Sequence, residues 1–277
     1  MPTVSIVVPA YNEEAVIERC LRAIVRQSVP PAEVLVVDNR STDGTREVVQ
    51  RVIDEHPRAG IRLLRQDGRQ GLVPTRNVGM DAATGDVFGR IDADTVLKPD
   101  WVAQVSRVFA AGVMDAVSGP VEYYDLPLRA IGQQIDDRLR RLQVRLAGDF
   151  VFLFGSNMAV RADAWRDVRE FLCDDEADVM HEDLDIAIHL ALGGRRIAYC
   201  SDMVAGMSAR RLDDRPRDFR RYVDRFENTY SAHDIRDVRL RAPMAVFLGV
   251  YPALHVHRRV QAQLRALRFH LGHGRHH

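Results

Sequence analysis

The first hundred residues alternate short apolar runs with longer stretches in which apolar residues recur every three or four positions. The apolar runs are 4–8, 34–37, 61–64 and 87–91, and turn residues separate each run from the next segment. Such continuous runs are typical of strands buried on both faces of a sheet, whereas the longer periodicity is typical of amphipathic helices. Strands and helices alternating at this spacing predict right-handed βαβ units and a mainly parallel sheet flanked by helices, an α/β fold.

The same periodicity predicts where the helices lie. The first helix is expected over 13–27, where Asn12 is suited to cap its free N–H groups. A second helix carries Val48 to Ile53, and a third spans 73–83. The second half is less regular. There we expect helices over 101–111, 126–146 and 184–192, strands over 116–124 and 196–200, and a turn at 155–157 after the apolar run 150–154.

Acidic residues stand where two of these strands end. Asp38 closes the second strand, and Asp92-Ala93-Asp94 follows the fourth. Ligands bind at the carboxyl ends of parallel strands, so both positions fall on the edge where a site is expected. Carboxylate oxygens suit Mg²⁺ or Mn²⁺, which bridge to phosphate oxygens. Alone, Asp-x-Asp equally fits a turn that caps the next helix.

The turn after the first strand excludes two common nucleotide-binding modes. It reads Pro9-Ala10-Tyr11-Asn12-Glu13-Glu14, with neither GxGxxG nor a P-loop. A nucleotide at this turn would therefore not be held by glycine amides.

Composition narrows the class of protein. The 277 residues are 46% hydrophobic, enough for one large α/β domain or two smaller ones, and the formal net charge of zero gives no sign of nucleic-acid binding. Cys20, Cys173 and Cys200 form no CxxC pair, so we expect a reducing cytoplasm and no zinc site or disulfide. We also expect no signal peptide, because the first residues lack a basic region and a cleavage site, and no run reaches the ~20 apolar residues of a membrane span.

The tail is basic and amphipathic. Val238 to His277 holds seven Arg, six His and no carboxylate, and apolar residues recur at helical spacing from Met244 to Leu271. The pattern fits a helix lying on the anionic inner face of a membrane, a helix packed on the body, or a helix packed on a second subunit in a homodimer.

Taken together, the motifs resemble one family. SIVVPAYNEE (5–14), VLVVDNRSTDGT (34–45), GLVPTRNVG (71–79) and GDVFGRIDADT (85–95) look like the inverting family 2 glycosyltransferases of the GT-A fold, and GSNMAV (155–160) and HEDLDIAIHLALGG (181–194) continue the likeness. The resemblance covers residues 3 to about 212. It implies a GT-A domain over 1–212, with a Rossmann-like nucleotide-sugar half (1–95) and an acceptor and base half (96–212), before a helical extension over 213–277.

The resemblance also implies roles on the donor side. The donor would be a UDP- or GDP-sugar, bound with Mn²⁺ or Mg²⁺. Asp94 would be the main metal ligand, and Asp92 would contact metal or ribose. The remaining donor-binding positions are Pro9, Tyr11, Glu13, Asp38, Gly71, Arg76 and Ala93, with Arg210 and Arg211 closing over the diphosphate. Arg76 would point toward the diphosphate or the metal carboxylates.

On the acceptor side, inverting transfer needs a carboxylate that deprotonates the attacking hydroxyl. By resemblance Asp183 is this base, Glu182 supports it, and Gly155, Ser156 and Asn157 form part of the acceptor pocket. The acceptor would be a glycan, a lipid-linked sugar or a small molecule. Arg220-Arg221-Tyr222 stands where processive members carry QxxRW, which argues against a polymer-making synthase.

Simpler interpretations stand beside these roles. Tyr11 fits a half-buried residue at a helix start, Asp38 a turn residue, and Arg76 a surface ion pair. Glu182 and Asp183 fit a helix N-terminus enriched in acids. Two other functions also stay open: a sugar-phosphate nucleotidyltransferase, and an inactive nucleotide-sugar-binding protein that retains the fold.

Overall fold

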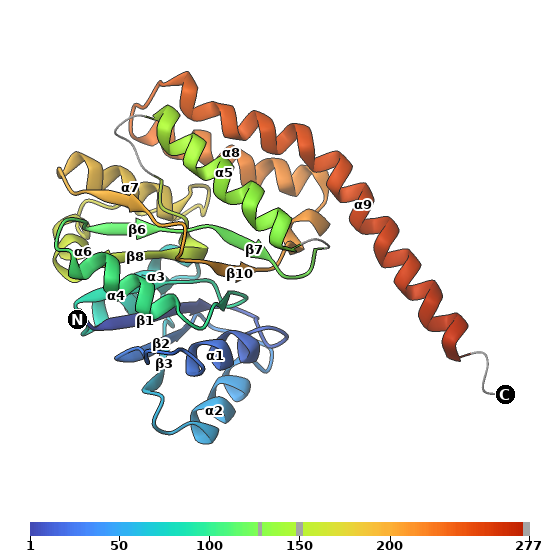
Figure 1. Ribbon diagram of the computed structural model, residues 1–277, viewed down its shortest axis with the longest axis horizontal. Coiled ribbons are helices and arrows are strands. Elements are labelled where there is room, and N and C mark those ends of the chain that lie inside the picture. Colours follow the sequence, from blue (N-terminus) through green and yellow to red (C-terminus); the bar gives the residue numbers. More distant parts are fainter. Residues whose placement is uncertain (127–128, 148–151, 274–277) are drawn as a thin grey trace. The chain divides into compact units, whose positions relative to one another are not determined.

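The computed structural model describes residues 1–126, 129–147 and 152–273 (Figure 1). The chain divides into two compact units, Met1–Ser208 and Ala209–His277. The sequence placed the boundary after residue 212, a few residues later. Each unit is described by itself.

The first unit begins with strands and helices in strict alternation. The elements are β1 (Val4–Ala10), α1 (Ile17–Val25), β2 (Glu33–Asp38), α2 (Thr45–Glu55), β3 (Ile61–Arg65), α3 (Leu72–Ala82) and β4 (Val87–Arg90). Its later part carries β5 (Val96–Leu97), α4 (Trp101–Ala110), β6 (Ala116–Ser118), β7 (Val121–Tyr123), α5 (Arg129–Ala147), the 3-10 helix η1 (Gly155–Asn157), β8 (Met158–Arg161), α6 (Ala162–Val168), α7 (Glu182–Leu192), β9 (Ile197–Tyr199) and β10 (Ala205–Met207).

The central sheet has the order β3-β2-β1-β4-β8-β6-β9. Its strands pair in parallel except β8, which is antiparallel to both β4 and β6. The α/β class with a mainly parallel sheet is therefore confirmed. A small second sheet has the order β5-β10-β7.

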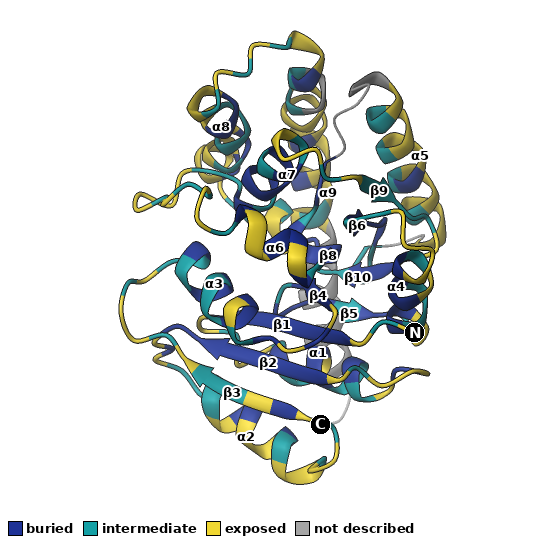
Figure 2. Cartoon of the chain, turned by 90° about the vertical axis from the view of Figure 1, so that its left-hand side faces the viewer, coloured by how far each residue is buried: buried dark blue, intermediate teal, exposed yellow. Residues whose placement is uncertain are grey.

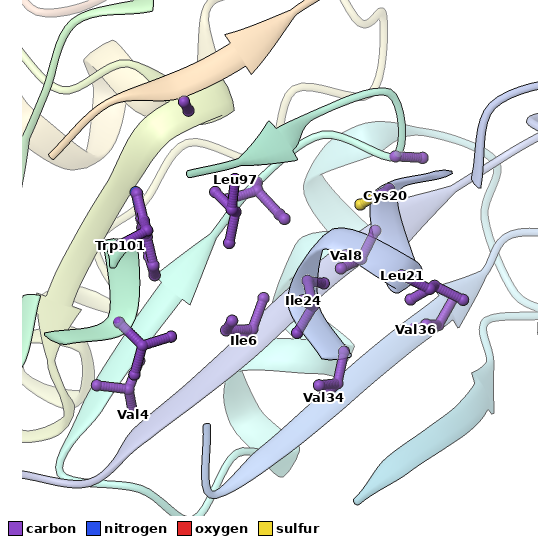
Figure 3. Close-up of a cluster of buried hydrophobic side chains, with 14 of the residues drawn as sticks. Val4, Ile6, Val8, Cys20, Leu21, Ile24, Val34, Val36, Leu97 and Trp101 are labelled. Carbon is purple, nitrogen blue, oxygen red and sulfur yellow. The ribbon is translucent and has the colours of Figure 1, made fainter. Parts of the chain in front are cut away.

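The two faces of the central sheet hold separate cores. On one face Ile6, Val8, Val34 and Val36 pack against α1, α2 and α4, and Figure 3 shows Cys20, Leu21 and Ile24 of α1 lying over these strands. On the other face Val7 and Leu35 belong to the core that includes residues of α3, α6 and α7. Because β1 and β2 are buried on both faces, they read as continuous apolar runs (Figure 2).

One glycine sets how closely α3 lies on the sheet. A Cβ built on Gly79 would meet Val7 Cγ1 at 2.4 Å and Val37 Cγ2 at 2.9 Å. Only glycine allows this approach, which brings α3 and its Arg76 down against the carboxyl half of β1 and β2.

Three sequence expectations are corrected. The first helix begins at Ile17, not residue 13, because Asn12 has φ 54° and its side chain bonds the β2 turn instead of capping α1. The single strand expected over 116–124 is two strands in different sheets, since Gly119-Pro120 interrupts the ladder. The strand over 196–200, expected as the last one of the chain, is followed by β10. Of the apolar run 150–154, residues 150 and 151 lie outside the described residues.

The second unit holds η2 (Arg210–Asp213), α8 (Pro216–Ala232), η3 (Val238–Arg241) and α9 (Ala242–His273). Phe219 of α8 stacks on Tyr251 of α9, with ring centroids 3.9 Å apart, and Val223 completes this small core. Tyr251 donates to the carbonyl of Asp214 at 2.5 Å. One face of α9 is therefore packed within its own unit.

Other apolar residues of α9 are exposed, among them Val246, Phe247, Val250 and Leu254. The predicted stripe continues to Leu264, Leu267 and Leu271, whose side chains lie outside the described residues. Across the described ranges, none of the helices combines the length and apolarity that crossing a bilayer requires.

Candidate active site

Hydrogen bonds between the turns after β1 and β2 hold the two turns side by side. Ser41 Oγ accepts from the Asn12 amide at 3.0 Å, and Thr45 Oγ1 accepts from the Glu13 amide at 2.8 Å. The Glu14 carboxylate accepts from the Gly44 amide at 2.9 Å. Since Ala10 and Asp38 are neighbours in the sheet register, these bonds extend the pairing past the strand ends.

This joined edge carries the first group of predicted donor-binding residues. Pro9 is buried in β1, and Tyr11 is about half exposed at 49%, so its ring is open to solvent beside the turn. Asp38 is buried, and both its oxygens lie 3.4 Å from the Ser41 amide, with Arg46 Nε at 3.9 Å. An exposed aromatic ring next to a buried carboxylate can stack on a base while the carboxylate accepts from its N–H groups.

Asn39, directly after Asp38, fixes the loop before α3. Its side-chain amide donates to the carbonyls of Gln66 and Arg69, and its oxygen accepts from the Gly71 amide at 2.8 Å. Gly71 has φ 144°, a conformation that favours glycine. The loop that carries Gly71 is thereby tied to the end of β2, close to Asp38.

The predicted metal carboxylates follow β4 directly. Asp92 is half-buried, whereas Ala93 and Asp94 are buried. Burial, followed by the negative charges of Asp94, Asp92 and Glu13, holds the pKa of the Cys20 thiol well above its ordinary value. The Cys20 thiol also donates to the Asp92 carbonyl at 3.7 Å, so the segment that carries Asp92 lies against α1.

This donor set fits a hard divalent cation. The carboxylates of Asp92 and Asp94 supply oxygen ligands and negative charge, which Mg²⁺ and Mn²⁺ prefer. Asp92 has one oxygen bound to Arg90, so its second oxygen is the one suited to a cation or a ribose hydroxyl. Asp92 and Asp94 would hold the metal.

A buried ion-pair network connects this site to α7. Arg90 Nη1 lies 2.8 Å from Asp92 Oδ1, and Arg90 Nη2 lies 2.9 Å from Glu182 Oε1. Arg76 Nη1 lies 2.5 Å from Glu182 Oε2 and 3.1 Å from the Glu182 carbonyl. Arg76 is fully buried, and its guanidinium donates to Glu182 and to the side chain of Asn77; the guanidinium that contacts Asp92 belongs to Arg90.

The two arginines determine the charge of Glu182. Burial opposes its ionisation, but Arg90 and Arg76 outweigh burial and hold the pKa of Glu182 below its ordinary range. Glu182 is therefore a fixed anion with both oxygens engaged. It suits the expected supporting role better than a proton-transfer role.

Asp183, the next residue, has the opposite electrostatic character. Burial and the neighbouring Glu182 charge raise the pKa of Asp183 to about 6. Its Oδ2 accepts from the Gly155 amide at 2.6 Å, and its Oδ1 accepts from the Leu184 amide at 2.9 Å. Two adjacent carboxylates whose environments push their pKa values apart are the arrangement from which acid–base roles are assigned.

The turn at η1 lies between the two carboxylate groups because β8 pairs with β4. Arg90 is the partner of Met158, so Gly155 to Asn157 lie beside the segment that leads to Asp92. A Cβ on Gly155 would meet Arg90 Nη1 at 2.3 Å and Glu182 Oε1 at 3.0 Å. Glycine is required there for the Arg90–Glu182 pair and the Asp183 bond to coexist.

The other two predicted acceptor residues differ in what they can contact. Asn157 is fully buried: its oxygen accepts from Trp101 Nε1 at 2.7 Å, and its amide donates to the carbonyls of Pro120 and Met203. Its side chain faces the interior and braces the turn. The Ser156 carbonyl accepts from Thr95 Oγ1 at 3.3 Å. Gly155 and Ser156 therefore stay the candidates for acceptor contact.

The first unit thus brings together most of the predicted site. Arg210 and Arg211 belong to the second unit, in η2, where Arg211 lies over the Tyr222 ring and pairs with Asp214 at 3.5 Å. Their predicted role at the diphosphate stays a prediction.

Sequence reasoning missed Arg90, which links the two halves of the site. One signal could have found it: it is the only charged residue in the apolar run 87–91, and a charge in a doubly buried strand needs partners nearby. Asp92, two residues along the chain, was the available partner.

Two family descriptions match the chain. Glycosyl transferase family 2 matches residues 5–169, more than half of the chain, and Glycosyl transferase family group 2 matches residues 90–263. The first match ends after η1 and β8, and the second includes α7, so together they cover every element of this site.

Curated relatives agree with this family. Glycosyltransferase AglE of Haloferax volcanii is 36% identical over 126 residues, which are 44% of this chain and 40% of AglE. Chondroitin synthase of Pasteurella multocida is 35% identical over 109 residues, 39% of this chain and 11% of the synthase. The matched part spans less than half the length of either relative.

Solved structures share the fold. Mannosyltransferase PcManGT from Pyrobaculum calidifontis, in complex with GDP-Man and Mn²⁺, has a TM-score of 0.68 at 22% identity over 98% of this chain and 80% of that one. S. aureus TarS 1–349 in complex with UDP-GlcNAc has a TM-score of 0.57 at 18% identity over 89% and 71%. The expected GT-A fold is confirmed.

Proposed function

Because this chain belongs to glycosyl transferase family 2, we propose that it is a metal-dependent, inverting glycosyltransferase acting on a nucleotide-diphosphate sugar. One observation carries the proposal. A buried Arg90–Glu182 pair links Asp92 of the Asp92-Ala93-Asp94 segment, which follows β4, to the start of α7, where Asp183 is a separate carboxylate with a raised pKa.

The donor would lie along the carboxyl edge of β1, β2 and β4. Tyr11 and Asp38 would hold the base, and Glu13 and Gly71 would line the ribose and phosphates. A cation held by Asp92 and Asp94 would supply positive charge to the departing diphosphate. Arg90 keeps Asp92 oriented through its 2.8 Å contact, so the ligand geometry is set before the donor arrives.

Asp183 would perform the proton transfer. The acceptor oxygen forms a bond to the anomeric carbon as the bond from that carbon to the diphosphate oxygen breaks, and the nucleoside diphosphate leaves with the electron pair. The hydroxyl proton passes to the Asp183 carboxylate. Attack from the face opposite the leaving group inverts the anomeric configuration, which requires no covalent enzyme intermediate.

The structural neighbours guide the choice of donor. PcManGT was solved with GDP-Man and Mn²⁺ and TarS with UDP-GlcNAc, so the proposed donors are GDP- and UDP-sugars with Mn²⁺ or Mg²⁺. The proposed acceptor is a glycan, a lipid-linked sugar or a small molecule with a free hydroxyl.

A thermal-shift panel of UDP-, GDP- and dTDP-sugars, each with and without Mn²⁺, tests this proposal. A ligand that binds only the folded state raises the unfolding midpoint by mass action. We expect one UDP- or GDP-sugar to raise it most, and only with Mn²⁺ present. A panel in which no nucleotide sugar shifts the midpoint in either condition would overturn the proposal.

The pH dependence of the reaction should report Asp183. Its pKa is raised to about 6, and the base must be ionised to accept a proton, so kcat/KM should fall as pH drops through about 6. The expected decrease is about tenfold per pH unit below that value. Initial rates between neutral and acid pH measure it, in a buffer series of constant ionic strength. A profile that stays flat down to the ordinary pKa of an aspartate would contradict the assignment.

A further inference from the structure

The long helix α5 turns an apolar stripe to solvent. Ile131, Ile135, Leu139 and Leu142 recur at spacings of four, four and three residues, so they form one stripe along the helix. Their exposed fractions are 52%, 52%, 53% and 50%. We name these four residues the α5 stripe. A surface helix normally turns its apolar stripe inward, whereas this one turns it to solvent, and Figure 2 draws much of α5 as exposed.

The inward face of α5 is polar and firmly bonded. Asp136 accepts from the Val121 amide at 2.9 Å and from Arg140 Nε at 2.6 Å. The Arg140 guanidinium lies 3.6 Å from the centre of the Phe154 ring. Asp137 accepts from Tyr199 at 3.0 Å and pairs with Arg141. These contacts fix the rotation of α5, so the exposed stripe is set by the structure of the unit.

Positively charged side chains lie beside the α5 stripe. Arg138 lies one turn from both Ile135 and Leu142, and Arg145 follows Leu142 by three residues; both arginines are exposed. The two acidic residues of α5, Asp136 and Asp137, are engaged in the bonds of the inward face. Arg138, Arg141 and Arg145 also line a hollow on this surface together with Gln134, Asp137 and Leu142.

We propose that the α5 stripe docks on an anionic lipid bilayer. An apolar stripe beside arginines matches a membrane surface, where the apolar side chains enter the acyl boundary and the guanidinium groups meet lipid phosphates. A second copy of the chain fits less well, because two such faces would bring like charges together. Arg140 joins the inward face of α5 to Phe154, which precedes Gly155, so docking would place α5 between the bilayer and the candidate acceptor turn; that consequence rests on the proposed function.

Vesicle sedimentation of the full chain tests the proposal. We expect binding to vesicles of phosphatidylcholine containing phosphatidylglycerol, little binding to phosphatidylcholine alone, and release by salt. Ile135→Glu and Leu139→Glu should each weaken binding about tenfold or more, because each replaces an apolar side chain that the bilayer would bury with a charged one. Arg138→Gln and Arg145→Gln should each weaken it about fivefold.

Matched variants separate docking from other effects. Leu192→Glu changes an exposed leucine at the end of α7, outside the stripe, and should leave vesicle binding unchanged. All the substituted side chains are exposed, so the thermal midpoint should be retained; Mn²⁺-dependent donor binding should be retained as well, which keeps this test distinct from that of the proposed function.

Three outcomes would overturn the proposal. Vesicle binding could be unchanged by the α5 variants and lost in Val250→Glu, which would assign it to α9. The α5 variants could convert a dimer to a monomer in analytical ultracentrifugation, which would assign the stripe to a second copy. The wild-type chain could also fail to bind anionic vesicles.

Discussion

Asp183→Asn is expected to lower turnover by about 10³-fold while leaving the fold intact. The amide keeps the size of the side chain, and its single oxygen can accept one of the two hydrogen bonds that Asp183 accepts, from the Gly155 or the Leu184 amide. Its NH2 group cannot accept the other bond and cannot take a proton at any working pH. The measurement is kcat at saturating donor, and the Kd for the donor should change little because Asp92 and Asp94 are untouched.

The neighbouring Asp185 provides a matched control. It is buried, accepts from the Cys173 amide at 3.0 Å and lies 3.5 Å from His189, so its contacts hold the loop before α7. Asp185→Asn should therefore show its effect in the free energy of unfolding, with kcat of the folded enzyme changed only a few-fold. If Asp183→Asn retained full turnover and Asp185→Asn lost it, the base would be misassigned.

Arg90→Met is expected to be the most destabilising single change in the site, at about 3–5 kcal/mol. Methionine fills most of the space but leaves Asp92 and Glu182 without the cation that they share in the interior. Urea unfolding measures this loss. In the same variant the fall of kcat/KM on the acid side should begin at a higher pH, because Arg90 helps to hold down the pKa of Asp183.

An ion pair whose arginine is exposed sets the scale for this comparison. Arg62 pairs with Glu33 at 3.1 Å, but its side chain is 53% exposed. Arg62→Met should therefore cost no more than about 1 kcal/mol. If Arg90→Met proved no more destabilising than Arg62→Met, the buried network would not be the link between the two halves of the site.

The parallel half of the fold could be predicted from sequence for a physical reason. Strands buried on both faces need largely apolar runs, and β1, β2 and β4 each have one, so the ends of β2 and β4, with Asp38 and Asp92, could be placed on one edge. β5, β8 and β10 were not predicted because they are two to four residues long and are defined by pairing with distant strands.

The site could be predicted only as a set of residues, and its contacts could not. A sequence motif places Arg76 near acidic residues but does not say which carboxylate it contacts. In the folded chain that carboxylate is Glu182, the first residue of α7. Asn157 reads as a polar turn residue, yet its three bonds to Trp101, Pro120 and Met203 place it in the core. Likewise, periodicity reveals the apolar stripe of α5 but not which side of the helix faces solvent.

The most direct test of the account is calorimetric titration of the donor identified by the thermal-shift panel into three proteins: wild type, Asp94→Asn and Asp183→Asn. With Mn²⁺ present, wild type and Asp183→Asn should bind the donor with similar Kd, and Asp94→Asn should show little binding. Removing the metal with a chelator should reduce wild type to the level of Asp94→Asn. Equal donor binding by wild type and Asp94→Asn, or wild-type binding that is insensitive to the chelator, would contradict the assignment of a metal and diphosphate site to Asp92-Ala93-Asp94.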